Sequence, residues 1–230
     1  MAEAGLAPSR QQAQALILAG RVRVRGEVVR RPAAPVQAVQ EIEVQGRRWA
    51  SRGALKLGPA LDYFQIQPAG RVCADVGAST GGFSDVLLDR GAALVFAVDV
   101  GRGLLDWRLR SDPRVHLMER TNARHLTSYP QPVSLQVVDL SFISLRQVLP
   151  ALRQSAPASE LVVLFKPQFE VGREHVGKRG VVRDEAAVQA ALADFQAWTA
   201  ENGFEWLGSV AAAIKGGEGN QEWMVHLRCR

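Results

Sequence analysis

The stretch VCADVGASTGGFSDVLLDRGA (72–92) decides the fold class. A buried-type strand at 72–76 is followed by a turn rich in glycine and small residues, and an amphipathic helix begins near Gly82. This order is typical of a parallel sheet that binds ligands beyond the carboxyl ends of its strands. Gly77, Gly81 and Gly82 would let the backbone approach a ligand closely, and the helix start attracts an anionic group. A plain strand–turn–helix with glycines kept for packing is the alternative interpretation.

The next stretch, ALVFAVDVG (93–101), is a second strand that ends in Asp99. An acidic residue at this position, downstream of Asp75 at the end of the first strand, typically accepts hydrogen bonds from ribose hydroxyls. A strand-end cap is the alternative role for Asp99. The dinucleotide fingerprint G-x-G-x-x-G is missing, and the spacing is G-x-x-x-G-G instead. This favours S-adenosylmethionine (SAM) over NAD, because SAM has no pyrophosphate and offers a methionine carboxylate to the helix start.

Helices and strands alternate through the rest of the chain, which predicts an α/β fold with a doubly wound parallel sheet. The expected strands are 72–76, 94–98, 115–118, 135–139 and 161–165, with closing strands near 204–210 and 223–227. The expected helices are 55–64, 82–90, 145–154 and 185–201. Residues 54–230 should therefore form the main domain.

Composition bounds the class of protein. The 230 residues are 47% hydrophobic and 22% charged, which is enough for one full core and disfavours long disorder. No apolar run approaches the roughly 20 residues that span a bilayer, and no signal-peptide pattern opens the chain. Cys73 and Cys229 have no partner at metal-ligand spacing, so both should be free thiols. We therefore expect a soluble cytoplasmic protein without a metal site.

Positive charge is concentrated at the start of the chain. Residues 1–56 hold ten lysines and arginines against four glutamates, whereas the remainder holds 18 basic and 19 acidic residues. A basic module beside a neutral one suggests a polyanionic partner, because each neutralised phosphate releases condensed counterions. A basic surface kept only for solubility is the alternative.

The basic segment shows the pattern of a small α+β unit. Residues 9–19 favour a short helix with Ser9 as its N-cap, and EIEV (41–44) favours a short strand. RVRVRGEVV (21–29) alternates arginine and valine around a glycine, which predicts a hairpin. One face of the hairpin would offer valines to a core. The other face would project Arg21, Arg23 and Arg25, whose mutual repulsion favours a phosphate-binding face.

Four further residues have side chains that are unexpected unless they serve a site. Asp139 and Lys166 end apolar strands, so they should lie on the same rim as Asp75 and Asp99. Lys56 lies in SRGALKL, and Glu222 follows the loop KGGEGN and opens a strand. Taken singly, they have ordinary explanations. A strand-end Asp or Lys is often a solvated terminus, and a helix lysine is often a surface charge.

These segments together resemble the TlyA family of ribosomal RNA methyltransferases, whose catalytic domain is of the FtsJ type. The matching segments are SRGALKL (51–57), DVGASTGGF (75–83), AVDVG (97–101), DPRVHLMERTNAR (112–124), DLSFISL (139–145), LPAL (149–152), FKPQFEVGRE (165–174), GVVRD (180–184) and IKGGEGNQEW (214–223). The start of the chain resembles an S4 RNA-binding domain with two departures. Arg25 stands where an asparagine usually precedes the glycine, and the usual first segment before Gly5 is missing.

The resemblance implies a Rossmann-like class I methyltransferase sheet (54–230), a linker (47–53) and a shortened S4-like domain (1–46). It implies a catalytic tetrad of Lys56, Asp139, Lys166 and Glu222. Lys166 would act as the general base and must be neutral to do so. The like charge of Lys56 favours the neutral form, whereas Asp139 and Glu222 oppose it and fix its orientation.

The resemblance also implies binding residues. The cofactor contacts would be Asp75, Gly77, Ser79, Gly81, Gly82, Phe83, Asp99, Asn122 and Asp139, with Asn122 near the adenine. The RNA contacts would be Arg10, Arg21, Arg23, Arg25 and Arg179. Arg179 lies in the basic loop 172–184, which would close on the RNA backbone as a lid or would be an ordinary solvated loop.

The function that the resemblance implies is SAM-dependent 2′-O-methylation of a cytidine ribose in ribosomal RNA. The residues themselves name no nucleotide, and likeness to the short form of the family favours large-subunit RNA. Three alternatives stay open: an RNA-binding protein with an inactive methyltransferase fold, a methyltransferase for a small molecule or protein, and a membrane-active haemolysin. A haemolysin would need a spanning or strongly amphipathic exposed helix, and the sequence offers neither. Nothing in the sequence indicates the oligomeric state.

Overall fold

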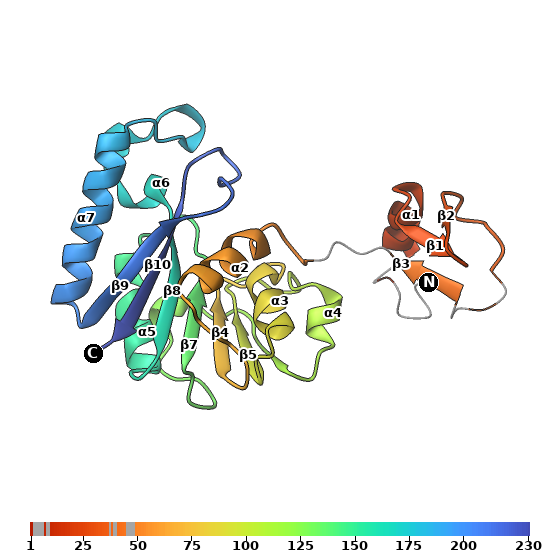
Figure 1. Ribbon diagram of the computed structural model, residues 1–230, viewed down its shortest axis with the longest axis horizontal. Coiled ribbons are helices and arrows are strands. Elements are labelled where there is room, and N and C mark those ends of the chain that lie inside the picture. Colours follow the sequence, from red (N-terminus) through yellow and green to blue (C-terminus); the bar gives the residue numbers. More distant parts are fainter. Residues whose placement is uncertain (2–6, 8–9, 37, 39–40, 45–48) are drawn as a thin grey trace. The chain divides into compact units, whose positions relative to one another are not determined.

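The computed structural model describes residues 1, 7, 10–36, 38, 41–44 and 49–230. The chain divides into two compact units, Met1–Trp49 and Ala50–Arg230 (Figure 1). The N-cap expected at Ser9 and the first two residues of the expected linker, Arg47 and Arg48, lie outside the described residues.

The first unit contains one helix and a small antiparallel sheet. Helix α1 (Arg10–Leu18) precedes the hairpin of β1 (Val22–Val24) and β2 (Glu27–Val29). Strand β3 (Ile42–Val44) pairs with the other edge of β1, which gives the order β2-β1-β3. Val22 is almost fully buried and pairs with the half-buried Val29, whereas Val28 is exposed. The hairpin thus offers Val22 to the core as predicted, and the other valines contribute less.

The hairpin turn corrects one expectation. Arg25 and Gly26 form a two-residue turn with φ values of 53° and 82°. A turn of this kind needs positive φ at both residues, which asparagine and glycine adopt most readily. Arg25 therefore occupies a strained turn position and is not on the strand face with Arg21 and Arg23. Its guanidinium lies 2.7 Å from Glu41, an ion pair that holds the turn against the segment leading into β3.

The second unit is built on a seven-stranded sheet (Figure 1). Its strands are β4 (Val72–Val76), β5 (Leu94–Val98), β6 (Val115–Met118), β7 (Leu135–Val138), β8 (Glu160–Phe165), β9 (Phe204–Ala211) and β10 (Trp223–Cys229). The order across the sheet is β6-β5-β4-β7-β8-β10-β9. Strands β4 to β8 run parallel, and β10 runs antiparallel to both of its neighbours. The predicted doubly wound sheet is thus confirmed, with one reversed strand near its end.

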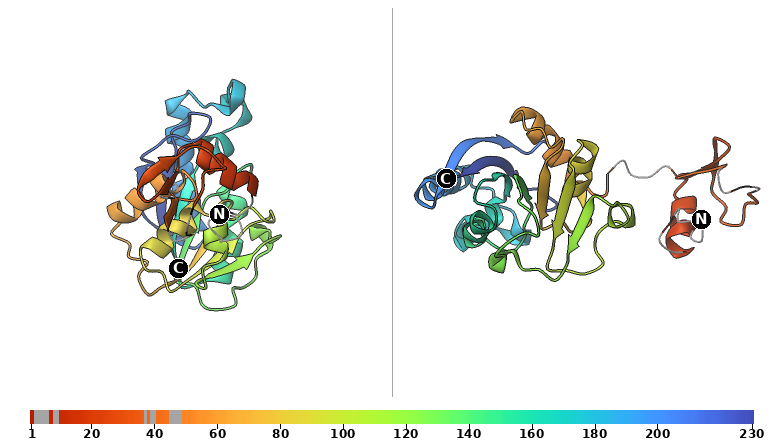
Figure 2. Two further views of the ribbon diagram at one scale, coloured as in Figure 1. Left: turned by 90° about the vertical axis from the view of Figure 1, so that its right-hand side faces the viewer. Right: turned by 90° about the horizontal axis from the view of Figure 1, so that it is seen from below.

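Helices cover both faces of this sheet (Figure 2). Helices α2 (Ala54–Tyr63) and α3 (Gly82–Asp89) lie on one face, and α5 (Leu149–Ser155) and α7 (Glu185–Glu201) lie on the other. The shorter elements are α4 (Trp107–Arg110), α6 (Pro167–Glu170) and 3-10 turns at Ala123–His125, Leu145–Gln147, Arg173–His175 and Lys178–Gly180. None of the helices in the described part of the chain is long and apolar enough to cross a membrane.

The helix expected at 145–154 is divided in two. A 3-10 turn ends at Gln147, and α5 begins at Leu149 with Pro150 in its first turn. Proline is favoured in the first turn of a helix, because it lacks the amide that a later position donates. The strand expected to include Asp139 ends one residue earlier, at Val138, so that the aspartate lies just beyond the sheet.

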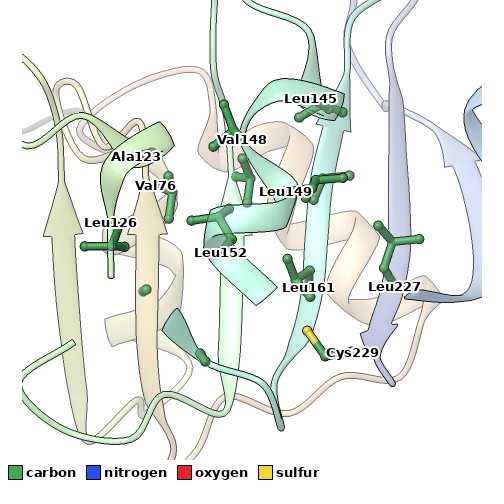
Figure 3. Packing of buried hydrophobic residues seen from close by; sticks show 14 of the residues in the cluster. Val76, Ala123, Leu126, Leu145, Val148, Leu149, Leu152, Leu161, Leu227 and Cys229 are labelled. Atoms are coloured by element: carbon green, nitrogen blue, oxygen red, sulfur yellow. The ribbon is translucent and has the colours of Figure 1, made fainter. Parts of the chain in front are cut away.

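The α5 face of the sheet carries a continuous apolar core. Leu149 and Leu152 of α5 pack toward Val76 and Leu161 of the sheet (Figure 3). All four side chains are fully buried. This packing fixes the parallel strands rigidly against the helix, so that the strand ends hold a defined geometry for a site.

Candidate active site

The carboxyl ends of the parallel strands bring the candidate residues to one rim. Val76, the last residue of β4, pairs with Val98 of β5 and Val138 of β7. Asp99 and Asp139, which follow those two strands directly, therefore lie beside the loop that follows β4. This is the edge at which open α/β sheets bind ligands.

The reversed direction of β10 places a further chain segment, the one before this strand, on the same rim. Lys166 directly follows Phe165, the last residue of β8. Trp223, the first residue of β10, pairs with Phe165. Because the two strands run in opposite directions, Glu222 lies opposite Lys166 although it precedes its own strand. The strand that runs against the sheet thus delivers an acidic side chain to the ends of the others.

The four candidate catalytic residues form two ion pairs. Lys166 Nζ lies 2.6 Å from Asp139 Oδ1, and Lys56 Nζ lies 2.6 Å from Glu222 Oε2. The side chains of Lys56, Lys166 and Glu222 are only 11%, 10% and 3% exposed, whereas that of Asp139 is 25% exposed. These lysines are nearly buried and paired with carboxylates, so they are not the solvated surface charges that lysines at such positions often are. They form a polar cluster at the mouth of a ligand-binding edge.

Lys56 reaches this cluster because its segment packs against α3 and the C-terminal loop. A Cβ on Gly82 would lie 2.0 Å from Ser51 Oγ, so only glycine lets the segment before α2 pass this closely. Arg52 donates a hydrogen bond to the carbonyl of Lys215, at 3.4 Å. These contacts hold the start of α2 between α3 and the loop that carries Glu222.

The glycines of the first loop also allow close packing within the protein. A Cβ on Gly77 would lie 2.2 Å from the carbonyl oxygen of Asp139, and a Cβ on Gly81 would lie 2.3 Å from a methyl group of Leu109. Gly77, Gly81 and Gly82 thus allow close approach of the protein's own atoms. Close packing, the alternative named for these glycines, accounts for their immediate contacts.

Asp99 organises the loops around it. Its Oδ2 accepts a hydrogen bond from the amide of Ser79 at 2.8 Å, and its Oδ1 accepts one from the amide of Gly101 at 2.7 Å. This is the strand-end cap that was the alternative role. Each carboxylate oxygen can accept a second hydrogen bond, so the cap leaves acceptor capacity for a ligand hydroxyl.

Asp75 is a fully buried carboxylate with one oxygen unsatisfied. Its Oδ2 accepts hydrogen bonds from the amide and the hydroxyl of Ser84, both at 2.7 Å. Its Oδ1 is buried without a partner among the described residues. Burial raises the pKa of Asp75 to about 7, an effect that the hydrogen bonds from Ser84 only partly oppose. A buried acceptor of this kind is suited to a ligand that donates a hydrogen bond.

Two cavities open at this rim. The larger, of about 420 Å³, is within the range of small-molecule sites, and its lining includes Gly77, Ser79, Asp99, Asn122 and Asp139. The smaller, of about 150 Å³, is lined by Lys56, Asp75, Gly77, Ser79, Gly82, Phe83 and Asp139, among others. All predicted cofactor-binding residues except Gly81 line one or both of these cavities. Asn122 also caps the following 3-10 turn, since its Oδ1 accepts from the amide of Arg124 at 3.0 Å.

The basic loop 172–184 is tied to the loop that carries Glu222. The buried side chain of Asn220 accepts a hydrogen bond from the amide of Val182 at 2.9 Å and donates one to the carbonyl of Gly180 at 2.8 Å. The basic side chains of this loop are exposed, including the predicted RNA contact Arg179, whose backbone has a φ of 66°. The loop is therefore held by its backbone and presents its charges outward.

Sequence reasoning missed three residues that shape the site. Lys166 Nζ donates a hydrogen bond to Ser141 Oγ at 2.9 Å. Glu170 accepts hydrogen bonds from Ser144 Oγ at 2.7 Å and from the amide of Leu145 at 2.8 Å. The third is Asn220. Ser141 and Glu170 lie inside the quoted motifs DLSFISL and FKPQFE, so their place beside Asp139 and Lys166 was the available signal.

The other predicted RNA contacts lie in the first unit. Arg10 and Arg25 are exposed, and Arg21 and Arg23 are half-buried. Arg23 donates to the carbonyl of Gly26 at 3.0 Å. The basic residues of the hairpin thus occupy both its strand and its turn.

Comparison with known proteins gives a consistent picture. The chain matches the FtsJ-like methyltransferase family over residues 49–229 and the S4 domain family over residues 1–42. It is 50% identical to the 16S/23S rRNA (cytidine-2'-O)-methyltransferase TlyA of Mycobacterium tuberculosis, across 97% of this chain and 86% of that protein. It is 37% identical to Hemolysin A of Brachyspira hyodysenteriae, across 97% of this chain and 95% of that protein.

A solved structure from Streptococcus thermophilus, which carries the hemolysin name, has the same fold. It superposes with a TM-score of 0.77 at 38% identity and covers 96% of this chain and 83% of that one. More distant solved structures, at 12 to 17% identity and with TM-scores of 0.52 to 0.55, carry methyltransferase names and share the fold.

Gly77→Ala is expected to separate the first loop from Asp139. The added methyl group would collide with the Asp139 carbonyl, so unfolding stability should fall by about 3 kcal/mol and SAM binding should weaken. Gly70→Ala is the matched control, because Gly70 also has positive φ, 72°, but has open space around it. That control should cost about 1 kcal/mol and leave SAM affinity unchanged. Equal effects of the two substitutions in urea unfolding and SAM titration would contradict the close approach.

Asp75 is expected to make stability depend on pH. Its folded-state pKa of about 7 is above its ordinary value of 3.8, so the folded protein holds a proton that the unfolded chain releases between these values. Stability should therefore fall as pH rises through this window, by at most about 1.4 kcal/mol per pH unit. Asp75→Asn should remove this slope. Urea unfolding of both proteins from pH 5 to pH 8 measures the difference, and parallel curves would show that Asp75 is ionised throughout.

Proposed function

The chain belongs to the TlyA family, with an FtsJ-like methyltransferase domain and an S4 domain, and on that premise we propose that it methylates the ribose 2′-hydroxyl of a cytidine in ribosomal RNA, with SAM as the methyl donor. The observation that carries this proposal is the pair of nearly buried lysine–carboxylate ion pairs beside the two cavities. A methyltransferase that acts on a hydroxyl group needs a proton acceptor. The amines of Lys166 and Lys56 lie at the strand ends beside the cavities, where a neutral amine could accept that proton.

The cavities fit SAM by the chemistry of their lining. Asp99 and Asn122 would contact the nucleoside part, since Asp99 keeps acceptor capacity for ribose hydroxyls. The unsatisfied oxygen of Asp75 would accept from the ammonium group of the methionine part, and Gly77, Ser79, Gly82 and Phe83 would surround it. Gly81 would act indirectly, by letting Leu109 pack under the loop. When bound, SAM supplies the methyl group as an electrophile.

The residues of the chain move the proton. A ribose hydroxyl is a poor nucleophile and must lose its proton as its oxygen is methylated. The Lys166 amine accepts that proton, after losing its own to solvent. Asp139 orients the amine, and the Lys56–Glu222 pair places a second cation and a second acceptor beside it. Alignment of the hydroxyl with the methyl group would supply most of the remaining acceleration.

The substrate class rests on charge and on the relatives. We propose residues 1–46 as the RNA-binding domain, 47–53 as the linker and 54–230 as the methyltransferase domain, and the boundary at Trp49–Ala50 supports this division. Arg10, Arg21, Arg23 and Arg25 would contact phosphates from the first domain, and Arg179 would do so from the basic loop. The M. tuberculosis relative is named for cytidines of 16S and 23S rRNA, which supports ribosomal RNA as the substrate here.

The other three functions are less well supported. The haemolysin name belongs to relatives of the chain. The nearly buried lysine–carboxylate pairs beside a cavity suit proton transfer at a bound substrate better than they suit membrane binding. All four tetrad side chains are present and paired, which argues against an inactive fold. The S4 domain argues against a small-molecule or protein substrate.

Lys166→Ala is expected to abolish methyl transfer while SAM still binds, because Lys166 acts on the hydroxyl. The measurement is transfer of radiolabelled methyl from SAM to ribosomal subunits and to naked ribosomal RNA, with SAM affinity measured in parallel. Lys178→Ala is the control, since Lys178 is an exposed lysine of the basic loop. The control should raise the KM for RNA and leave kcat unchanged. Turnover retained by Lys166→Ala would refute its role as the base.

Replacing Arg21, Arg23 and Arg25 together with alanine is expected to weaken RNA binding and flatten its salt dependence. Each lost phosphate contact lowers the slope of log affinity against log salt by about 0.7 to 0.9. Arg25 already pairs with Glu41, so its single replacement should change the slope least. RNA titrations at several salt concentrations measure the slope. A slope equal to that of the wild type would remove the hairpin from the RNA interface.

A further inference from the structure

Ser141 is a polar residue at the catalytic lysine to which the tetrad gives no role. It lies in the loop after β7, two residues beyond Asp139, and its Oγ accepts a hydrogen bond of 2.9 Å from Lys166 Nζ. We propose that Ser141 is a positioning residue that fixes the direction of the Lys166 amine for proton transfer. This proposal rests on the proposed function, because it deepens the role of Lys166 as the base.

The valence of the amine carries the argument. A lysine nitrogen has four tetrahedral directions, one of which is the bond to its own side chain. In the charged form, one N–H donates a hydrogen bond to Ser141 at 2.9 Å, and the carboxylate of Asp139 forms an ion pair with the nitrogen at 2.6 Å. One direction is left over when a second N–H faces that carboxylate. After the amine loses a proton, two N–H groups remain for these two acceptors. The lone pair then occupies the third direction, where a substrate hydroxyl can meet it.

Asp139 alone would not fix this direction. An ion pair sets the distance between the amine and the carboxylate but not the direction of the N–H bonds, so with Asp139 alone the lone pair would point toward the substrate only part of the time. A second acceptor at a different place removes that freedom. Ser141 supplies it without adding charge, so it orients the base and holds the ammonium form less strongly than a second carboxylate would.

The loop that carries Ser141 is anchored to the segment that carries Lys166. Glu170, four residues after Lys166, accepts hydrogen bonds from Ser144 Oγ at 2.7 Å and from the amide of Leu145 at 2.8 Å. Asp139 binds Lys166 at one end of the loop, and Glu170 binds the other end. Ser141 is therefore held between two attachments, and its hydroxyl has a defined position relative to the amine.

The test compares serine-to-alanine changes at two places in this loop. Ser141→Ala removes the acceptor at Lys166, and Ser144→Ala removes a hydrogen bond to Glu170 while leaving Lys166 with both of its partners. Ser141→Thr keeps the hydroxyl, and Ser141 is exposed enough to accept the extra methyl group. For each protein the measurements are SAM affinity, KM for RNA, and kcat at saturating substrates across the pH range.

We expect Ser141→Ala to lower the plateau value of kcat by about tenfold, the effect of losing one hydrogen bond. Its KM for RNA and its SAM affinity should stay within about twofold of wild type. The rising limb of kcat against pH should move to lower pH by about half a unit to one unit, because the charged amine loses an acceptor. Ser141→Thr should restore both values. Ser144→Ala should leave the pH limb in place.

Three results would overturn the proposal. The first is an unchanged kcat and pH limb in Ser141→Ala. The second is a loss of SAM affinity with unchanged kcat at saturation, which would make Ser141 a cofactor contact. The third is the same pH shift in Ser144→Ala, which would make the effect one of loop structure. A wild-type protein that transfers no methyl group to RNA would instead refute the proposed function.

Discussion

The direction of β10 is the constraint on which the active site depends. Five parallel strands bring their carboxyl ends to one rim, and only residues that follow a strand can reach it from them. Because β10 runs the other way beside β8, a residue that precedes a strand, Glu222, arrives at the same rim opposite Lys166. The second ion pair, with Lys56, can form only in this arrangement. Topology thus determines which side chains meet, and local sequence determines which chemistry they carry.

The two ion pairs link stability to function. Lys56 and Glu222 are nearly buried, so removing one partner would leave the other as an uncompensated charge. In its proposed role as the base, Lys166 would lose its proton before it acts, and Asp139 would then lie beside a neutral amine. The carboxylate of Asp139 is the most exposed side chain of the four, and solvent would stabilise it during this step. On this proposal, the more buried pair holds the site together and the more exposed pair carries out the proton transfer.

Much of the fold could be predicted because its signals are local. The runs at 72–76, 94–98 and 115–118 are apolar and short, and these strands have the predicted bounds, as does α7. Asp139 and Lys166 could be singled out because a charged residue at the end of an apolar strand is conspicuous, whereas the full tetrad with Lys56 and Glu222 followed from the resemblance to the family. Ser141 and Glu170 were missed, since their partners are 25 or more residues away and serine and glutamate are common in loops. The packing contacts of the glycines in the first loop could not be predicted for a similar reason, because contacts such as that of Gly82 with Ser51 depend on tertiary structure.

The central claim is that the chain places a methyl group on the ribose oxygen of a cytidine in ribosomal RNA. The most direct measurement is to incubate the protein with ribosomal subunits and SAM, digest the RNA to nucleosides, and identify the methylated nucleoside by mass spectrometry. We predict that the amount of 2′-O-methylcytidine increases with time and with enzyme concentration. A methyl group on a base, on another ribose, or on a ribosomal protein would contradict it, and so would the absence of any methylated product when SAM is bound.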